Sequence, residues 1–349
     1  MAREFKQFDI ISTDEVNSIS DHYYFCPSKS LSSSTTKHIM KEWRILKKNL
    51  PDSIFVRVYE ERVDLLRAVI IGPTGTPYHD GFFFFFFFDI QVPSDYSASP
   101  PNVYYRSFGY SINPNVKAWG SVCLSLLNTW DGQKYQLWNP FQSTILQVLV
   151  SIQGLVLNAE PYYNEPGYGN LSPRPSWFKK RSLRYNEDVF IMSCKTMLSI
   201  LKRPPKSFEE FVNQYFRNPA SAILVACNAY INGQVEIGGP IITSTAETEI
   251  TTSLTSFTFK AAAGSLYPRL VDPFIKNGSS VESIELLDTS KIMRKNIGRR
   301  RRIYQLAAVM LLVLVIFAIP FVQKAYGAGV LLYSLFGFYI LLLFICVYL

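Results

Sequence analysis

The segment from Asn113 to Leu127 reads NPNVKAWGSVCLSLL, and it places Cys123 eight residues after the asparagine that closes an Asn-Pro-Asn turn. A cysteine in a short apolar run, soon after a tight turn, is well placed to act as a nucleophile. The structural alternative is a small core hydrophobe, since free cysteine is among the most often buried residue types. That alternative fits Cys194, Cys227 and Cys346 better, because each lies in a helical apolar pattern.

The histidines limit the chemistry of such a nucleophile. A cysteine protease needs an imidazole base beside the thiol, but the three histidines, His22, His38 and His79, all precede Cys123 and none has a catalytic setting. Thioester exchange needs no such base, because the incoming acyl group is already activated and a thiol is a good leaving group. The residues therefore favour acyl transfer through a thioester on Cys123.

Four runs of β-branched and apolar residues precede the turn. They cover residues 54–58, 65–72, 82–92 and 103–106, and their alternation predicts an antiparallel meander. The segment Gly72 to Pro77 superficially resembles a phosphate-binding loop, but it lacks a Gly-Lys-Ser/Thr ending and leads into a strand, so it is interpreted as a hairpin turn.

Seven consecutive phenylalanines, Phe82 to Phe88, occupy the third of these strands. Alternate side chains of a strand point to opposite faces, so this run places aromatic rings on both faces of the sheet. Either both faces are covered by other layers, or one face is exposed and prone to aggregation. The sequence leaves this choice open.

Helical periodicity flanks the strands. A helix is expected to begin near Thr35 or Thr36, where a hydroxyl can cap it, and to end at Pro51. Its apolar stripe consists of Ile39, Trp43, Leu46 and Leu50. Further helices are expected over residues 141–158, 181–201, 208–216 and 220–232, the first of them packing on the sheet. The predicted fold class is therefore α+β, a four-stranded antiparallel meander with flanking helices.

The chain divides by composition. Residues 1–35 are rich in serine and threonine and are expected to be disordered, and residues 238–298 are expected to form a flexible linker. Between them we expect a folded domain over 36–200 and a helical extension over 201–237. No repeat of solenoid period is present.

The net charge of +8 does not indicate nucleic-acid binding. Seven basic residues, namely Lys291, Arg294, Lys295 and Arg299 to Arg302, lie in one stretch without an acid, and the remainder carries only about +1. The five cysteines are scattered and lack CxxC spacing, so neither a disulfide framework nor a zinc site is predicted.

The order of several motifs carries a resemblance to a known family. The motifs are Gly72-Pro73-x-Gly75-Thr76-Pro77-Tyr78, Pro100-Pro101-x-Val103, Asn113-Pro114-Asn115 with Cys123, and Trp138-x-Pro140. Together they resemble the ubiquitin-conjugating (E2) catalytic fold over roughly residues 35–200, about half of the chain. Residues 146–165 and 208–232 are more particular and resemble the large E2 subgroup that includes E2/E3 hybrids, the BIR-repeat E2 and plant phosphate-response E2 proteins.

The resemblance implies specific roles. Cys123 would accept ubiquitin from a ubiquitin-activating enzyme (E1) as a thioester, and a lysine of a target protein would later attack it. Asn115 would stabilise the oxyanion or brace the active-site loop, and the basic helix face formed by Lys37, Lys41 and Arg44 would dock E1. The implied partners are ubiquitin, E1 and an E3 ligase, and no cofactor is bound directly because E1 uses the ATP upstream.

Three positions depart from the usual E2 pattern. Asn113 stands where most E2 enzymes have histidine, as the large subgroup also does. The acid that often orients the attacking lysine is missing after the predicted 141–158 helix, where Asn164 and Glu165 are the polar candidates. Ala98 replaces an aromatic residue that contacts RING-type E3 proteins, although Pro140 of the second contact loop is present. The missing acid near Tyr163 and the phenylalanine run Phe82 to Phe88 are the two reasons for an alternative function, a catalytically weak E2-like scaffold that holds ubiquitin or an E3 at a membrane.

The C-terminal end predicts a membrane anchor. Residues 303–322 and 325–349 are uncharged and apolar, and each is long enough to cross a bilayer. The basic run before residue 303 fits the positive-inside rule, so we expect a transmembrane helical hairpin with the enzyme domain in the cytosol, by inference at the endoplasmic reticulum. The alternatives are a single span with an interfacial second segment, or buried helices of a soluble domain.

Overall fold

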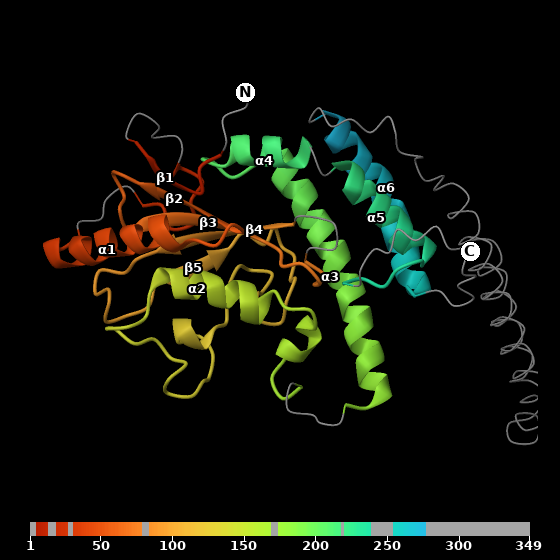
Figure 1. The fold of residues 1–349 in the computed structure, drawn as a ribbon, viewed down its shortest axis with the longest axis horizontal. Helices are drawn as coiled ribbons and strands as arrows, with labels where there is room; N and C mark the ends of the chain where they lie inside the picture. The colour runs from red at the N-terminus through yellow and green to blue at the C-terminus, as the bar shows by residue number, and fades with distance from the viewer. Residues whose placement is uncertain are drawn as a thin grey trace, which may run out of the picture. The chain divides into compact units, whose positions relative to one another are not determined.

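The structure is a computed structural model, and it describes residues 5–12, 19–26, 31–78, 84–168, 174–217, 220–238 and 254–276. The five strands are β1 (Phe8–Ile11), β2 (Ile54–Tyr59), β3 (Leu65–Ile71), β4 (Phe85–Gln91) and β5 (Asn102–Tyr105). The α-helices are α1 (Ser33–Asn49), α2 (Ile145–Ser151), α3 (Ser176–Lys202), α4 (Glu209–Arg217), α5 (Ala220–Asn232) and α6 (Phe257–Lys276), as Figure 1 shows.

The sheet contains the predicted meander and one further strand. Strands β2 to β5 pair antiparallel in chain order, as predicted, but β1 pairs parallel with β2, with Phe8 opposite Val56. The sheet is therefore five-stranded and mixed, and the prediction of a disordered segment over 1–35 is wrong for β1. The run Phe-Asp-Ile-Ile is too short to show periodicity, and its reason to be ordered is the backbone edge of β2 that it pairs with.

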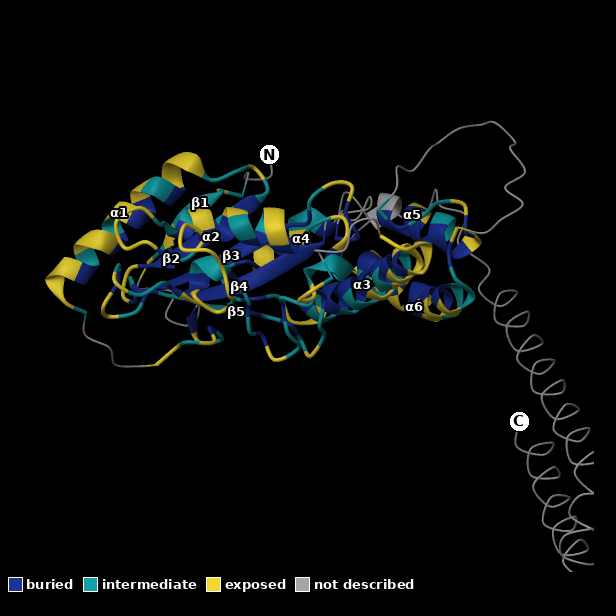
Figure 2. Ribbon diagram, turned by 90° about the horizontal axis from the view of Figure 1, so that it is seen from below, coloured by how far each residue is buried: buried dark blue, intermediate teal, exposed yellow. Residues whose placement is uncertain are grey.

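The phenylalanine strand is covered on both faces. Phe85 and Phe87 point to one face, where their rings lie 5.0 Å from Phe211 and 5.3 Å from Phe208 respectively, at and just before α4. On the opposite face, the ring of Phe86 lies 5.5 Å from Tyr78. Phe84 to Phe88 are each at most 2% exposed, and Figure 2 shows β3 and β4 almost entirely buried. Phe82 and Phe83 lie outside the described residues.

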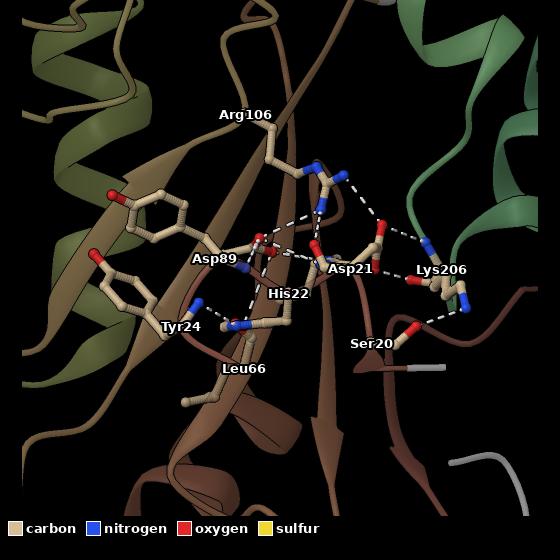
Figure 3. A network of polar contacts seen from close by, with 10 residues as sticks. Ser20, Asp21, His22, Tyr24, Leu66, Asp89, Arg106 and Lys206 are labelled. Carbon is tan, nitrogen blue, oxygen red and sulfur yellow. Dashed lines mark hydrogen bonds and ion pairs between the residues drawn. The ribbon is translucent and has the colours of Figure 1, made fainter. Parts of the chain in front are cut away.

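A buried charge network holds residues 19–26 against the α4 side of the sheet (Figure 3). Arg67 of β3 pairs with Asp89 of β4 at 2.6 Å and reaches Asp21 at 2.7 Å. Arg106 pairs with the same two carboxylates. Burial alone would raise the pKa of Asp89, but the attraction of Arg67 and Arg106 holds that pKa below its ordinary value.

Several helix boundaries differ from the sequence prediction. Helix α1 begins earlier, because the Ser32 hydroxyl accepts a hydrogen bond from the Thr35 backbone N–H. Helix α2 is capped by Thr144 and passes at Ile152–Val156 into a π-helical turn, η3, so the predicted 141–158 helix is shorter and irregular. Helix α3 extends to Ser176, where aromatic contacts of Phe178 secure its first turns.

Residues 238–298 are not a continuous flexible linker, because α6 lies within them. Its apolar residues recur at helical spacing, and Phe259, Ala263, Leu270 and Phe274 are buried. The sequence prediction missed this helix because it contains Pro268 and Pro273, and proline inside a helix usually interrupts it. The helix packs against α3 and α5.

The predicted membrane segments, 303–322 and 325–349, lie outside the described residues. Within the described part of the chain, no helix combines the length and apolarity that crossing a bilayer would require.

His22 predicts acid sensitivity of this fold. Burial lowers the pKa of His22, and the nearby Arg67 and Arg106 lower it further, against the opposing pull of Asp89. The neutral ring accepts a hydrogen bond at Nδ1 from the Tyr24 N–H, while Nε2 lies 2.9 Å from the Leu66 carbonyl. Because the unfolded chain binds this proton more readily, the free energy of unfolding should fall as pH drops below about 6.5.

Urea unfolding of the full chain between about pH 7 and pH 5 measures this slope. In His22→Gln, which cannot titrate but can still donate to Leu66, the slope should be smaller. The matched control is His38→Gln on the exposed side of α1, which should keep the wild-type slope. An equal slope in the His22 variant would contradict the assignment.

Candidate functional site

Cys123 lies at the end of a tight hairpin that follows β5. The Val116 N–H donates to the Asn113 carbonyl, and Val116 then pairs with Val122 across the hairpin. Gly120 sits in the loop with a φ of +90° and its Cα lies directly against the Tyr104 ring, so no side chain fits there. The hairpin thus sets the position of Cys123 through local backbone geometry.

The cysteine is free and half-buried. Its backbone N–H donates to the Asn115 carbonyl at 2.8 Å, which brings together the two site residues predicted from the sequence. The side-chain Oδ1 of Asn115 is buried and has no hydrogen-bond partner among the described residues. A free, half-buried cysteine whose backbone is bonded to an asparagine is an arrangement that can carry nucleophilic acyl chemistry.

The segment after Cys123 folds back and bonds to the backbone of the residues on either side of the cysteine. A short 3-10 helix, η2 (Ser125–Leu127), turns the chain, and Thr129 then returns to the cysteine. The Thr129 hydroxyl donates to the Val122 carbonyl at 2.8 Å and accepts from the Leu124 N–H at 2.9 Å. One side chain therefore holds the residues on both sides of Cys123.

Asn113 is the buried hub of the site, and the sequence marked it only as a departure from histidine. Its Nδ2 donates to the Tyr78 hydroxyl at 2.8 Å and to the Val156 carbonyl at 2.7 Å. Its Oδ1 accepts from the Asn115 N–H at 2.8 Å and from Asn164 Nδ2 at 3.3 Å. Asn113 is fully buried, and its two donated bonds, to Tyr78 and to Val156, are shielded from water. Asn113 thus ties the hairpin to the end of the π-helical turn.

Asn164 and Glu165, the predicted candidates for orienting a lysine, have different roles in the structure. Asn164 lies in a 3-10 turn, η4 (Pro161–Asn164), and its amide is engaged by Asn113, Asn158 and the Val156 carbonyl. It braces the loop and has little capacity left for a substrate. Glu165 is exposed directly after this turn.

The predicted partner surfaces are accessible. Lys37, Lys41 and Arg44 are exposed on α1. Ala98 and Pro140 are also exposed, and their two loops are joined by a hydrogen bond of 2.8 Å from the Trp138 indole N–H to the Ser97 carbonyl. Phe141, directly after Pro140, is 92% exposed, and it was not singled out by the sequence.

Metal chemistry finds no support in the described residues, where no group of three or more His, Cys, Asp or Glu side chains could hold an ion. The reactive group that the geometry presents is the Cys123 thiol.

Comparison with known proteins places this site in a family. A family model described as ubiquitin-conjugating enzyme matches residues 38–182. The chain is 47% identical over 280 residues to putative ubiquitin-conjugating enzyme E2 38 of Arabidopsis thaliana, covering 79% of this chain and 82% of that one. It is 53% identical over 232 residues to probable ubiquitin-conjugating enzyme E2 25 of the same plant, covering 66% of this chain but 37% of the relative.

A more distant relative is the human dual E2 ubiquitin-conjugating enzyme/E3 ubiquitin-protein ligase BIRC6, at 36% identity over 243 residues, which are 65% of this chain and 5% of that protein. The fold, the hairpin cysteine and these matches define an α+β conjugating domain of the E2 type. The chain belongs to the ubiquitin-conjugating enzyme family and is an E2 enzyme.

Asn113 generates a stability prediction. In Asn113→Asp the carboxylate keeps both acceptor contacts but cannot donate, so the Val156 carbonyl and the Tyr78 hydroxyl each lose a buried partner. We expect the free energy of unfolding to fall by about 2 to 4 kcal/mol, measured by urea denaturation. The same exchange at the exposed Asn49, whose amide donates only to Ile45, should cost no more than about 0.5 kcal/mol. Equal stability of the two variants would contradict the hub role.

Proposed function

We propose that Cys123 accepts ubiquitin from E1 as a thioester and passes it to a lysine of a target protein. The observation that carries this proposal is a free, half-buried cysteine whose backbone N–H donates to the Asn115 carbonyl and whose two neighbours, Val122 and Leu124, are bonded by the Thr129 hydroxyl. In the loading step the Cys123 thiol loses its proton and the sulfur attacks the thioester carbonyl of E1-bound ubiquitin. A new C–S bond forms as the C–S bond to the E1 cysteine breaks, and the departing E1 thiolate takes up the proton that Cys123 lost.

Asn115 is the second residue of the proposed mechanism. Attack on a thioester carbonyl places negative charge on the carbonyl oxygen, and a nearby side-chain amide N–H stabilises that charge. Its backbone N–H is fixed by Asn113, and within the described part of the chain its side-chain amide makes no hydrogen bond, so the amide N–H is left to donate to the oxyanion. No cofactor is needed in this scheme, since E1 uses ATP upstream.

The partner surfaces follow from the same proposal. E1 would dock on the exposed basic face of α1, through Lys37, Lys41 and Arg44. An E3 ligase would use the loops that carry Ala98 and Pro140, with Phe141 offering an aromatic contact that Ala98 does not.

The weak-scaffold alternative loses one of its two reasons. Exposure of the phenylalanine run would have suggested a binding face, but Phe84 to Phe88 are buried in the core. Its other reason, the missing acid near Tyr163, bears on the transfer to lysine and not on the loading of Cys123.

Loading of Cys123 can be tested directly. Full-length chain incubated with E1, ATP and ubiquitin should form an adduct that a reducing agent removes, and Cys123→Ala should abolish it. Cys123→Ser should give an adduct that survives reducing agent, because an ester replaces the thioester. The control is Cys26→Ala, since Cys26 is also free and exposed and should have no effect. An adduct that persists in Cys123→Ala would refute the assignment.

We further propose that residues 303–322 and 325–349 anchor the enzyme in a membrane as a helical hairpin, with the catalytic domain in the cytosol. The support is the length and apolarity of the two segments and the arginine run Arg299 to Arg302 before them. The endoplasmic reticulum is the proposed membrane.

Alkaline carbonate extraction measures this anchoring. The full-length chain should remain in the membrane pellet, because spanning segments are not released by high pH, while a chain truncated after Gly298 should be extracted completely. Recovery of both proteins in the soluble fraction would disprove the anchor.

A further inference from the structure

A second feature near Cys123 is a groove of about 930 Å³ between two loops. Trp130, Asp131 and Trp138 line one wall, and Pro166 and Gly167 line the other. These loops come from the segment after the cysteine and from the segment after η4, which are more than thirty residues apart in sequence. No role in the loading step requires this groove.

The first wall is fixed to the cysteine segment. Thr129 holds the residues on both sides of Cys123, as described above, and the Ser125 hydroxyl donates to the Asp131 carbonyl at 3.3 Å. Gly132 packs against the Ser125 side chain so closely that a Cβ would not fit. The carboxylate of Asp131 is therefore carried on a loop that is anchored within a few residues of the sulfur.

The second wall is fixed to the other side of the site. Pro166 and Gly167 follow η4 directly, and Asn164 at the end of η4 bonds to Asn113, whose Oδ1 also accepts from the Asn115 N–H. Thr129, which itself lines the groove, bonds to the residues on both sides of Cys123, so the groove adjoins the segment that carries the thiol.

The groove has one acidic group along its described lining, the Asp131 carboxylate. Asp131 is exposed, and within the described part of the chain its carboxylate makes no hydrogen bond or ion pair. The nearby Glu160 is different, because it pairs with Arg174 at 3.0 Å. Asp131 is therefore an uncommitted anion facing open space.

We propose that this groove receives the acceptor lysine and that Asp131 binds its ε-ammonium group. The inference rests on the proposed thioester at Cys123, and it names the acidic group for the incoming amine. Charge complementarity favours a cation, and the tryptophan rings of the same wall add the aromatic surface that ammonium groups prefer. The remaining polar candidates fit less well, since Asn164 is consumed by structural bonds and Glu165 lies outside the lining.

The transfer step balances without a co-reactant. The bound ammonium loses one proton to water, and the neutral amine then attacks the thioester carbonyl carbon. The C–N bond forms, the C–S bond breaks, and the electron pair leaves with the Cys123 sulfur. The nitrogen loses a second proton, which returns to the Cys123 thiolate. Asp131 acts in this scheme by binding and orienting the cation rather than by removing its proton.

The test separates loading from discharge. Full-length wild-type chain and Asp131→Asn are loaded with ubiquitin by E1, the E1 is then stopped by removing ATP, and the thioester is chased with free lysine or with hydroxylamine. Lysine is cationic at neutral pH, whereas hydroxylamine is an uncharged nucleophile. Asp52→Asn serves as the matched control, because Asp52 is an exposed acid in the turn after α1.

Asp131→Asn should load normally and should discharge to lysine about fivefold more slowly than wild type, the size of an exposed ion pair. The difference should shrink at high salt. Its discharge to hydroxylamine should match wild type, which also shows that the variant is folded. Asp131→Glu should recover most of the lysine rate, and Asp52→Asn should behave as wild type.

Two outcomes would overturn the inference. One is discharge of Asp131→Asn to lysine at the wild-type rate. The other is an equal slowing with both nucleophiles, which would mean that Asp131 supports the loop and does not recognise the cation. Failure of the wild-type chain to load would instead refute the thioester proposal, and it would be seen before any chase is added.

Discussion

The fold depends on one constraint, the burial of both faces of β4. Phe85 and Phe87 face one side of the sheet and Phe86 and Phe88 face the other, so neither side can be left to water. Helix α4 and the segment before it supply Phe208 and Phe211 for the first side. The chain after residue 200 is thereby part of the sheet's own core, although composition alone would treat it as an extension.

The same face carries a buried pair of charges, and these also need partners. Arg67 and Asp89 lie opposite each other on β3 and β4, and each would be costly to bury alone. Residues 19–26 complete the pairing through Asp21, which contacts both Arg67 and Arg106, while Arg106 also pairs with Asp89. The N-terminal segment is therefore held by two kinds of contact. Asp21 forms ion pairs with Arg67 and Arg106, and β1 pairs with β2.

Besides its backbone pairing with β5, the active-site hairpin is connected to this core through the side-chain amide of Asn113. Asn113 joins Tyr78, which follows β3, to the carbonyl of Val156 in the π-helical turn, and it fixes Asn115 by its backbone. A π turn leaves carbonyls without their usual helical donors, and asparagine side chains satisfy them here. Cys123 therefore lies on a short loop that is held rigidly by the sheet, the crossover helix and Thr129, while its sulfur remains accessible.

The sequence by itself determined the local features, namely the four meander strands, the helix positions and the candidate cysteine, because alternation, helical spacing and turn residues act over a few neighbours. It missed β1 and α6, since a four-residue strand and a helix with two prolines become stable only through β2 and through α3 and α5. The hub role of Asn113 and the groove that brings the Asp131 loop together with the segment after η4 were decided by the tertiary structure alone. Both depend on hydrogen bonds between segments that are distant in the chain, and no local pattern records which segments will meet.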